Sequence, residues 1–161
     1  MSEYTTGAKA GALAGAISTI ISIIWSYYVS SMLIEEVFKH IANVSSEALG
    51  MVKVFMAIGF IIGYIIDVGI CVVVGILCTK VIVSLKYSWP IQGVIAAIIF
   101  FVINQVIGLA GSAFGSSIQN IPPELVEKIG YLTPVSYIVS LISALVFGLI
   151  YAYFMAKWLK Q

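Results

Sequence analysis

The sequence contains no arginine, and only 9% of its 161 residues carry a charged side chain. Soluble globular domains have roughly 25% charged residues, so the composition excludes that class. The net charge is +1 at pH 7, and the eight basic residues, all lysines, form no basic patch. Because nucleic-acid binding depends on clustered positive charge, nucleic acid is excluded as a partner.

Histidine and cysteine are also scarce, which limits metal and redox chemistry. His40 is the single histidine, so haem ligation by two histidines of one chain and a histidine metal cluster are excluded. Cys71 and Cys78 would lie roughly 10 Å apart on one helix, too far for a disulfide. The sequence contains no Cys-x-x-Cys, phosphate-binding loop, Gly-x-Ser-x-Gly or His-Glu-x-x-His motif. We therefore expect no enzymatic activity, no metal and no cofactor.

Long apolar runs dominate the chain, of which 61% is hydrophobic. A membrane-spanning helix needs about 20 apolar residues, so the runs predict an all-α, polytopic integral membrane protein with one domain, 1–161, in the lipid bilayer. We expect the first run to be retained as a span, because it is too long for a signal peptide and lacks a cleavage pattern. The four predicted spans and two long loops are 7–34, 54–79, 91–117 and 135–157, with loops 35–53 and 118–134.

The loops carry further local signals. The polar stretch 35–53 predicts a continuation of the first helix followed by a short amphipathic helix at the interface. Asn43 begins an Asn-Val-Ser sequon, which matters only if this loop faces outside. Pro123 and Gly130 predict the start and end of a short helix, and Thr133-Pro134 predicts the cap of the fourth span.

Each predicted span carries small residues at four-residue intervals, in lines that we call small-residue edges. In lipid, such edges let helix backbones approach closely, as in GxxxG pairs. They predict a tightly packed four-helix bundle or an oligomer, and the pattern does not separate these two. The edges comprise Gly7, Gly11, Gly15 and Thr19; Gly59, Gly63, Asp67, Cys71, Gly75 and Thr79; Asn104, Gly108, Ser112 and Ser116, with Gly111 and Gly115 alongside; and Ser136, Ser140, Ala144, Gly148, Ala152 and Ala156.

Asp67 is the sharpest functional candidate, because it is an acid in the middle of a span. A central Asp costs about 2.5–3.5 kcal/mol on membrane-insertion scales, so its side chain needs a partner, a proton or a watery cavity. No basic residue lies at its depth, and we expect a neutral, hydrogen-bonding acid. Asn104 lies at a similar depth and is the expected partner. Other polar residues at broadly similar depth complete the predicted layer: Thr19, Ser22, Gln105, Ser140 and Ser143.

Several interpretations of this layer remain open. Asp67 can join helices through hydrogen bonds, line an ion or proton path, or contact a partner subunit. The first functional hypothesis is a non-enzymatic structural or accessory subunit that associates with other membrane subunits or with itself. The alternative is a small transporter or channel in which Asp67 and Asn104 handle an ion, a proton or a small polar solute.

Lysine placement predicts the orientation. With the N-terminus inside, five lysines lie on the inner side and three on the outer side, which favours cytoplasmic termini in the cell membrane. The loops 35–53 and 118–134 are then outer loops. Trp25, Tyr27 and Tyr28 are expected to form an aromatic belt at the outer interface.

Overall fold

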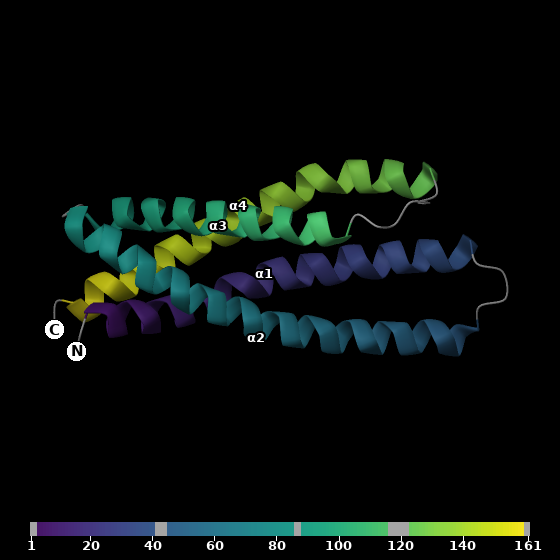
Figure 1. Ribbon diagram of the computed structural model, residues 1–161, viewed down its shortest axis with the longest axis horizontal. Helices are drawn as coiled ribbons and strands as arrows, with labels where there is room; N and C mark the ends of the chain where they lie inside the picture. Colours follow the sequence, from purple (N-terminus) through teal and green to yellow (C-terminus); the bar gives the residue numbers. More distant parts are fainter. Residues whose placement is uncertain (1–2, 41–44, 86–87, 116–122, 160–161) are drawn as a thin grey trace.

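The computed structural model describes residues 3–40, 45–85, 88–115 and 123–159, and within these ranges all regular structure is helical. The four helices are α1 (Glu3–His40), α2 (Ser46–Leu85), α3 (Trp89–Gly115) and α4 (Pro123–Leu159) (Figure 1). Each is long and apolar enough to cross a membrane. These four candidate spans suggest a multi-pass membrane protein, in which helices are favoured because they satisfy their own backbone hydrogen bonds in lipid.

The expected short helix after the first span is instead part of α2. α1 continues to His40, and α2 begins at Ser46 and runs without interruption to Leu85. Ser45 caps α2, since its Oγ accepts a hydrogen bond from the backbone N–H of Ala48 at 3.2 Å. The first turns of α2 contain no proline, so nothing ends the helix before the apolar run begins. Asn43 and its sequon lie outside the described residues.

The helix expected to end at Gly130 also continues, and α4 includes Pro134 in its interior. Proline has no N–H for the carbonyl four residues back, which here belongs to Gly130. Hydroxyls near this point bond other carbonyls: Thr133 Oγ1 donates to Ile129 O at 2.7 Å, and Ser136 Oγ donates to Leu132 O at 3.0 Å. Ser and Thr side chains of this kind help membrane helices tolerate proline.

The helices are arranged in the order α2, α1, α4, α3. α1 packs against both α2 and α4, and α3 packs against α4, whereas α2 and α3 make only limited contact. α1 begins and α4 ends at one end of the molecule, whereas α1 ends and α2 begins at the other end (Figure 1). We call these ends the terminal end and the loop end.

The fully buried core occupies the half of the molecule nearer the terminal end. Phe100 of α3 stacks on Phe147 of α4 with ring centroids 4.3 Å apart, and Phe147 stacks on Tyr151. Buried residues occur in the ranges 6–19 of α1, 71–82 of α2, 93–100 of α3 and 143–155 of α4. In the other half, every side chain whose burial is described is partly or fully exposed.

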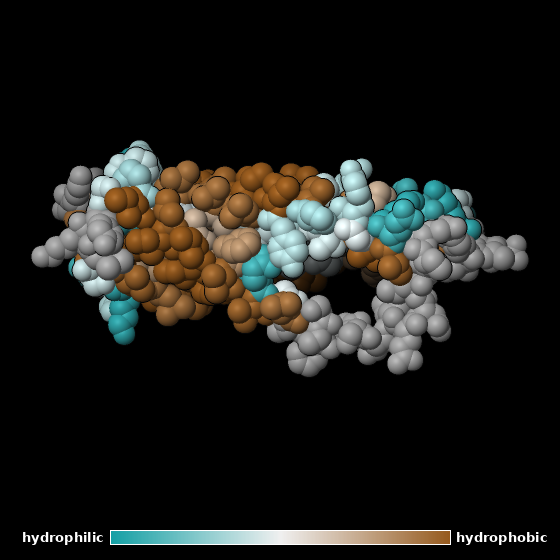
Figure 2. Space-filling model, turned by 90° about the horizontal axis from the view of Figure 1, so that it is seen from above, coloured by the Kyte–Doolittle hydropathy of each residue, from teal (hydrophilic) through white to brown (hydrophobic). Residues whose placement is uncertain are grey.

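The surface follows the same division. Seen from above, apolar residues cover much of the length of the molecule, and hydrophilic residues gather towards the loop end (Figure 2). The loop end therefore lacks a hydrophobic core among its described residues, and hydrophilic residues gather towards it on the face shown in Figure 2. Beyond the core, the spaces between the diverging helices form the candidate site.

Candidate functional site

A cavity of about 490 Å³ lies beside the inner edge of the core and is lined by residues of all four helices. Thr19, Cys71 and Phe100, which are buried core residues, form part of its wall. The rest of the lining contains both polar side chains, with hydroxyl, carboxyl and carboxamide groups, and apolar side chains. The complete lining is Thr19, Ser22, Trp25, Ser26, Val29, Ser30, Asp67, Ile70, Cys71, Phe100, Asn104, Ile107, Gly108, Ser136, Val139 and Ser140.

Asp67 of α2 is the only acidic or basic side chain in this lining. Its side chain is partly buried, and it makes no hydrogen bond to another residue that the structure describes. Asp67 also lines a second cavity of about 460 Å³ between α1 and α2, which shares Ser22 and Ser26 with the first. Asp67 therefore lines two spaces that also share residues of α1.

Asn104 of α3 lines the same cavity as Asp67, but the expected hydrogen bond between them is not formed among the described contacts. Asn104 also lines a neighbouring cavity of about 450 Å³ between α1, α3 and α4. Gln105 lines that neighbouring cavity, where its Nε2 donates a hydrogen bond to Ser140 Oγ at 3.4 Å. Asp67 and Asn104 therefore share a cavity, and no hydrogen bond described between them closes it.

The remaining predicted polar residues serve different purposes. Thr19 lines the main cavity, and its hydroxyl donates to the carbonyl of Gly15 on its own helix. Ser140 lines both the main and the neighbouring cavity. Ser143 is buried and donates to the carbonyl of Ser18 at 2.8 Å, which joins α4 to α1. The structure thus brings Thr19, Asp67, Asn104 and Ser140 to one cavity and places Ser143 in the packing.

Sequence reasoning missed part of the cavity wall. Trp25, expected in an interfacial belt, lines the cavity, and its Nε1 donates to Ser136 Oγ at 2.9 Å. Ser26 and Ser30 of α1 also line it. Ser22, Ser26 and Ser30 follow one another at four-residue spacing. This spacing indicates a polar face on the helix and could have been recognised in the sequence.

The glycines of the terminal half bring backbones together. A Cβ built on Gly11 would lie 2.5 Å from the carbonyl oxygen of Cys71 and 2.9 Å from the Cα of Gly75. A Cβ on Gly15 would collide with the Cys71 side chain, and a Cβ on Gly148 with the carbonyl of Gly93. α1 therefore packs backbone-to-backbone on α2, and α4 packs in the same way on α3. Ala144 is buried in the same core.

The glycines beyond the core have open surroundings. A Cβ on Gly59, Gly63 or Gly108 would meet no atom of another helix within 4 Å. Gly59 and Gly63 line the cavity between α1 and α2 beside Asp67. Gly111 and Gly115 belong to the last turns of α3, and their surroundings lie outside the described part of the structure. The small-residue edge of α2 thus divides near Asp67 into a packed half and an open half.

A buried polar group that the sequence did not predict lies below the cavity. Tyr151 of α4 is fully buried, and its hydroxyl donates to the carbonyl of Gly75 at 2.8 Å. Thr79 Oγ1 lies 2.9 Å from the same hydroxyl and 2.8 Å from the Gly75 carbonyl. These bonds join α4 to α2 and help close the space between the helices at the terminal end.

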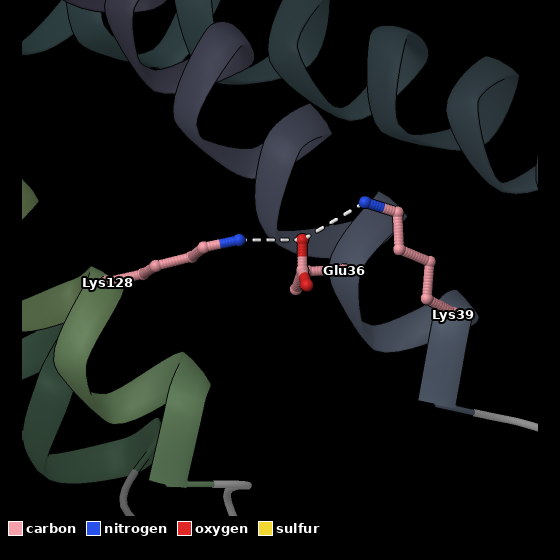
Figure 3. A network of polar contacts seen from close by, with 3 residues as sticks. All are labelled: Glu36, Lys39 and Lys128. Carbon is pink, nitrogen blue, oxygen red and sulfur yellow. Dashed lines mark hydrogen bonds and ion pairs between the residues drawn. The ribbon is translucent and has the colours of Figure 1, made fainter.

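Ion pairs join the helices at the loop end. Glu36 of α1 lies between Lys39 of the same helix, at 3.3 Å, and Lys128 of α4, at 2.7 Å (Figure 3). Glu35 pairs with Lys53 of α2 at 2.5 Å. The lysine side chains are between 34% and 69% exposed, so these are water-accessible pairs. They link α1 to both neighbours where the described residues form no apolar core.

The side chains that line the cavity offer several kinds of contact to a ligand. Within the described ranges, no three His, Cys, Asp or Glu side chains are grouped as metal ligands. The cavity offers one carboxyl group, hydroxyls, a carboxamide and two aromatic rings. Comparisons of the chain with protein-family models, curated proteins and solved structures found no match.

Proposed function

We propose that this chain is a small membrane transport protein whose cavity around Asp67 and Asn104 takes up a small polar solute or an ion. The observation that supports this proposal is the convergence of polar residues from four apolar helices on a cavity of about 490 Å³. Intramembrane acids that face a cavity commonly mark solute or proton paths. A carboxyl group used only to join helices would be expected to bond a neighbouring helix, and Asp67 bonds none of the described residues.

The two ends of the molecule also suit alternating access to such a cavity. On the terminal side, backbone contacts and the buried Tyr151 close the bundle. At the loop end, exposed ion pairs link the helices, and exposed pairs exchange with water at little free-energy cost. We therefore propose that solute enters from the loop end and that transport requires the terminal half to loosen.

Transport can be tested in liposomes that contain the purified protein and the pH-sensitive dye pyranine. We expect addition of NaCl, KCl or methylammonium chloride to change the internal pH faster than in empty liposomes. Asp67→Asn should reduce the rate to that of empty liposomes, because the variant cannot exchange a proton or balance a cation. Glu47→Gln removes one acid from the exposed first turn of α2 and should leave the rate unchanged.

Fluxes equal to those of empty liposomes for the wild-type protein would contradict transport of these probes. An Asp67→Asn variant as active as wild type would contradict the assigned role of the acid. Thermal unfolding and gel filtration of each variant show whether the comparison is made between folded proteins.

A second function, an accessory subunit of a membrane assembly, is supported by a different observation. Gly59 and Gly63 are not packed closely against another helix of this chain, and small residues of this kind favour close helix contact in lipid. In-cell crosslinking from a photoreactive residue at Phe55, which is 72% exposed on α2, tests this function. A discrete adduct that is lost in Gly59→Leu would support a subunit, and absence of any adduct would contradict it.

A further inference from the structure

Asp67 is the one acidic or basic side chain in the lining of either cavity, so any formal charge that the lining carries is negative. Neither the main cavity nor the one between α1 and α2 is lined by lysine, histidine or a second acid. An ionised Asp67 in these partly apolar surroundings favours one positive charge, since a charge buried without a partner is costly. An anion would have no cationic partner in either lining.

The size of the cavity favours a molecule over a bare metal ion. A water molecule occupies about 30 Å³ of liquid volume, so about 490 Å³ holds far more than one dehydrated cation. A metal ion needs several oxygen ligands at about 2.0–2.6 Å converging on one point. The oxygen-bearing side chains of this lining come from four helices, which suits a ligand with several contact points.

Aromatic rings form two parts of this wall. Phe100 is held by its stacking on Phe147, and Trp25 is held by the hydrogen bond from its indole N–H to Ser136. The tryptophan ring is also 5.9 Å from the ring of Tyr28, centroid to centroid. Aromatic faces attract organic cations, most strongly at tryptophan. Because both rings are held by other residues, little ordering is needed when a ligand binds.

We propose that the cavity binds a small organic monocation of the ammonium class, with its positive charge beside Asp67 and its apolar groups against Trp25 and Phe100. Serine hydroxyls and the carboxamide of Asn104 are available to a polar substituent of the ligand. This proposal names a substrate class for the proposed transport function. It rests on that function only where the ligand is said to cross the membrane. Binding itself is measurable without transport.

The test uses three probes of nearly the same shape and different charge: choline, its neutral carbon analogue 3,3-dimethylbutan-1-ol, and the anion 3,3-dimethylbutanoate. Isothermal titration calorimetry of the full-length protein in lipid nanodiscs measures their affinities. We expect choline to bind about tenfold or more tightly than the neutral analogue, because a desolvated charge pair and cation–π contacts favour the cation. The anion should give no measurable binding.

Two variants assign the contacts. Asp67→Asn should weaken choline binding about tenfold or more and leave the neutral analogue nearly unaffected, whereas the Glu47→Gln control should bind choline as wild type does. Trp25→Leu should weaken choline binding about threefold or more, while Trp89→Leu, outside the cavity lining, should not. Ser136→Ala keeps the indole and removes its hydrogen bond, so a smaller loss in this variant than in Trp25→Leu supports a direct role of the ring.

The outcomes separate this proposal from the transport function. Choline binding that depends on Asp67, with no flux of choline into proteoliposomes, would support the proposal and contradict transport. Equal binding of the three probes, unchanged affinity in Asp67→Asn, or absence of choline binding would overturn the proposal, and the pyranine assay with NaCl and KCl would still decide transport. Displacement of choline by millimolar NaCl to the same degree as by tetramethylammonium would also overturn it, because it would indicate a site for inorganic cations.

Discussion

Single glycine positions differ sharply in what they contribute to this protein. Gly75 of α2 faces α1 so closely that a Cβ there would lie 2.5 Å from the carbonyl oxygen of Gly7 and 2.8 Å from the Cα of Gly11. Both are backbone atoms, which move only with their helix. Gly59 lies on the same edge of the same helix and has open space around it. Substitution of alanine at these two positions therefore separates the effect of close packing from the effect of helix propensity.

We expect Gly75→Ala to destabilise the protein by roughly 1–3 kcal/mol, the usual cost of overpacking. Gly59→Ala should be neutral or slightly stabilising, because alanine has the higher helix propensity and meets no neighbour. Unfolding in mixed detergent micelles, followed by circular dichroism, measures both changes. Equal stability of the two variants would contradict the close α1–α2 contact.

Tyr151 shows how one residue can join two helices where no motif predicts it. The sequence around it reads only as an aromatic part of an apolar span, and its partners, Gly75 and Thr79, lie more than seventy residues away. Interhelical hydrogen bonds in membranes contribute on average about 0.6 kcal/mol each. Their value here is mainly geometric, because they hold α4 against α2 beside the closely packed glycines.

At the scale of the helices, the chain is held together differently at its two ends. In the terminal half, backbone contact and stacked aromatic rings join the helices. At the loop end, α1 is linked to α4 by Glu36 and Lys128 and to α2 by Glu35 and Lys53. Packing contacts are insensitive to ionic strength, whereas attraction between exposed charges is screened by salt.

We therefore predict that salt separates the helices at the loop end and not in the core. The Debye length falls from about 10 Å at 0.1 M salt to about 3 Å at 1 M, which weakens the ion pairs. Spin labels at Val37 of α1 and Val126 of α4, both exposed, should move apart by about 1–2 Å or more, the size of typical helix shifts. Double electron–electron resonance measures the distance.

A control pair tests whether the change is local. Labels at Leu13 of α1 and Leu149 of α4 lie on exposed positions of the terminal half and should keep their distance at both salt concentrations. A change of the same size in both pairs would indicate that the whole bundle loosens, and no change in either would show that the ion pairs do not hold the loop end.

At the scale of the whole molecule, the even number of candidate spans predicts that both termini lie on the same side of the membrane. α1 begins and α4 ends at the same end of the structure (Figure 1), and the lysine distribution favours the cytoplasm for that end. The loop end would then face outwards. This orientation also decides the side from which the cavity is reached in the proposed transport function.

We predict that Glu47→Cys is labelled by a membrane-impermeant maleimide on intact cells and that Leu159→Cys is labelled only after lysis. Cys71 and Cys78 are buried and are replaced by alanine in both variants to remove background. Labelling of both positions on intact cells would contradict a common side for the termini and an opposite side for the α1–α2 connection. Labelling of Leu159→Cys on intact cells, with Glu47→Cys labelled only after lysis, would contradict only the orientation that the lysines predict.

The composition and the apolar runs were enough to predict an all-helical chain with four candidate spans, because lipid leaves few alternatives to a helix for twenty consecutive apolar residues. Helix ends were predicted less well: Gly130 and Pro134 read as an end and a start, but α4 passes through both. Hydroxyl groups of Thr133 and Ser136 bond carbonyls of the preceding turn, and such bonds help a membrane helix to continue through proline.

The sequence by itself also drew attention to Asp67, because a lone acid in an apolar span has no local explanation. Only the tertiary structure decided what surrounds this acid. Four-residue spacing places Gly59 and Gly75 on one helix edge but carries no information about where α1 leaves that edge. The helices diverge beyond the core, so the same pattern produces close backbone contact at Gly75 and open space at Gly59. The cavity beside Asp67 depends on that divergence, which is a property of how four helices pack together and not of any one of them.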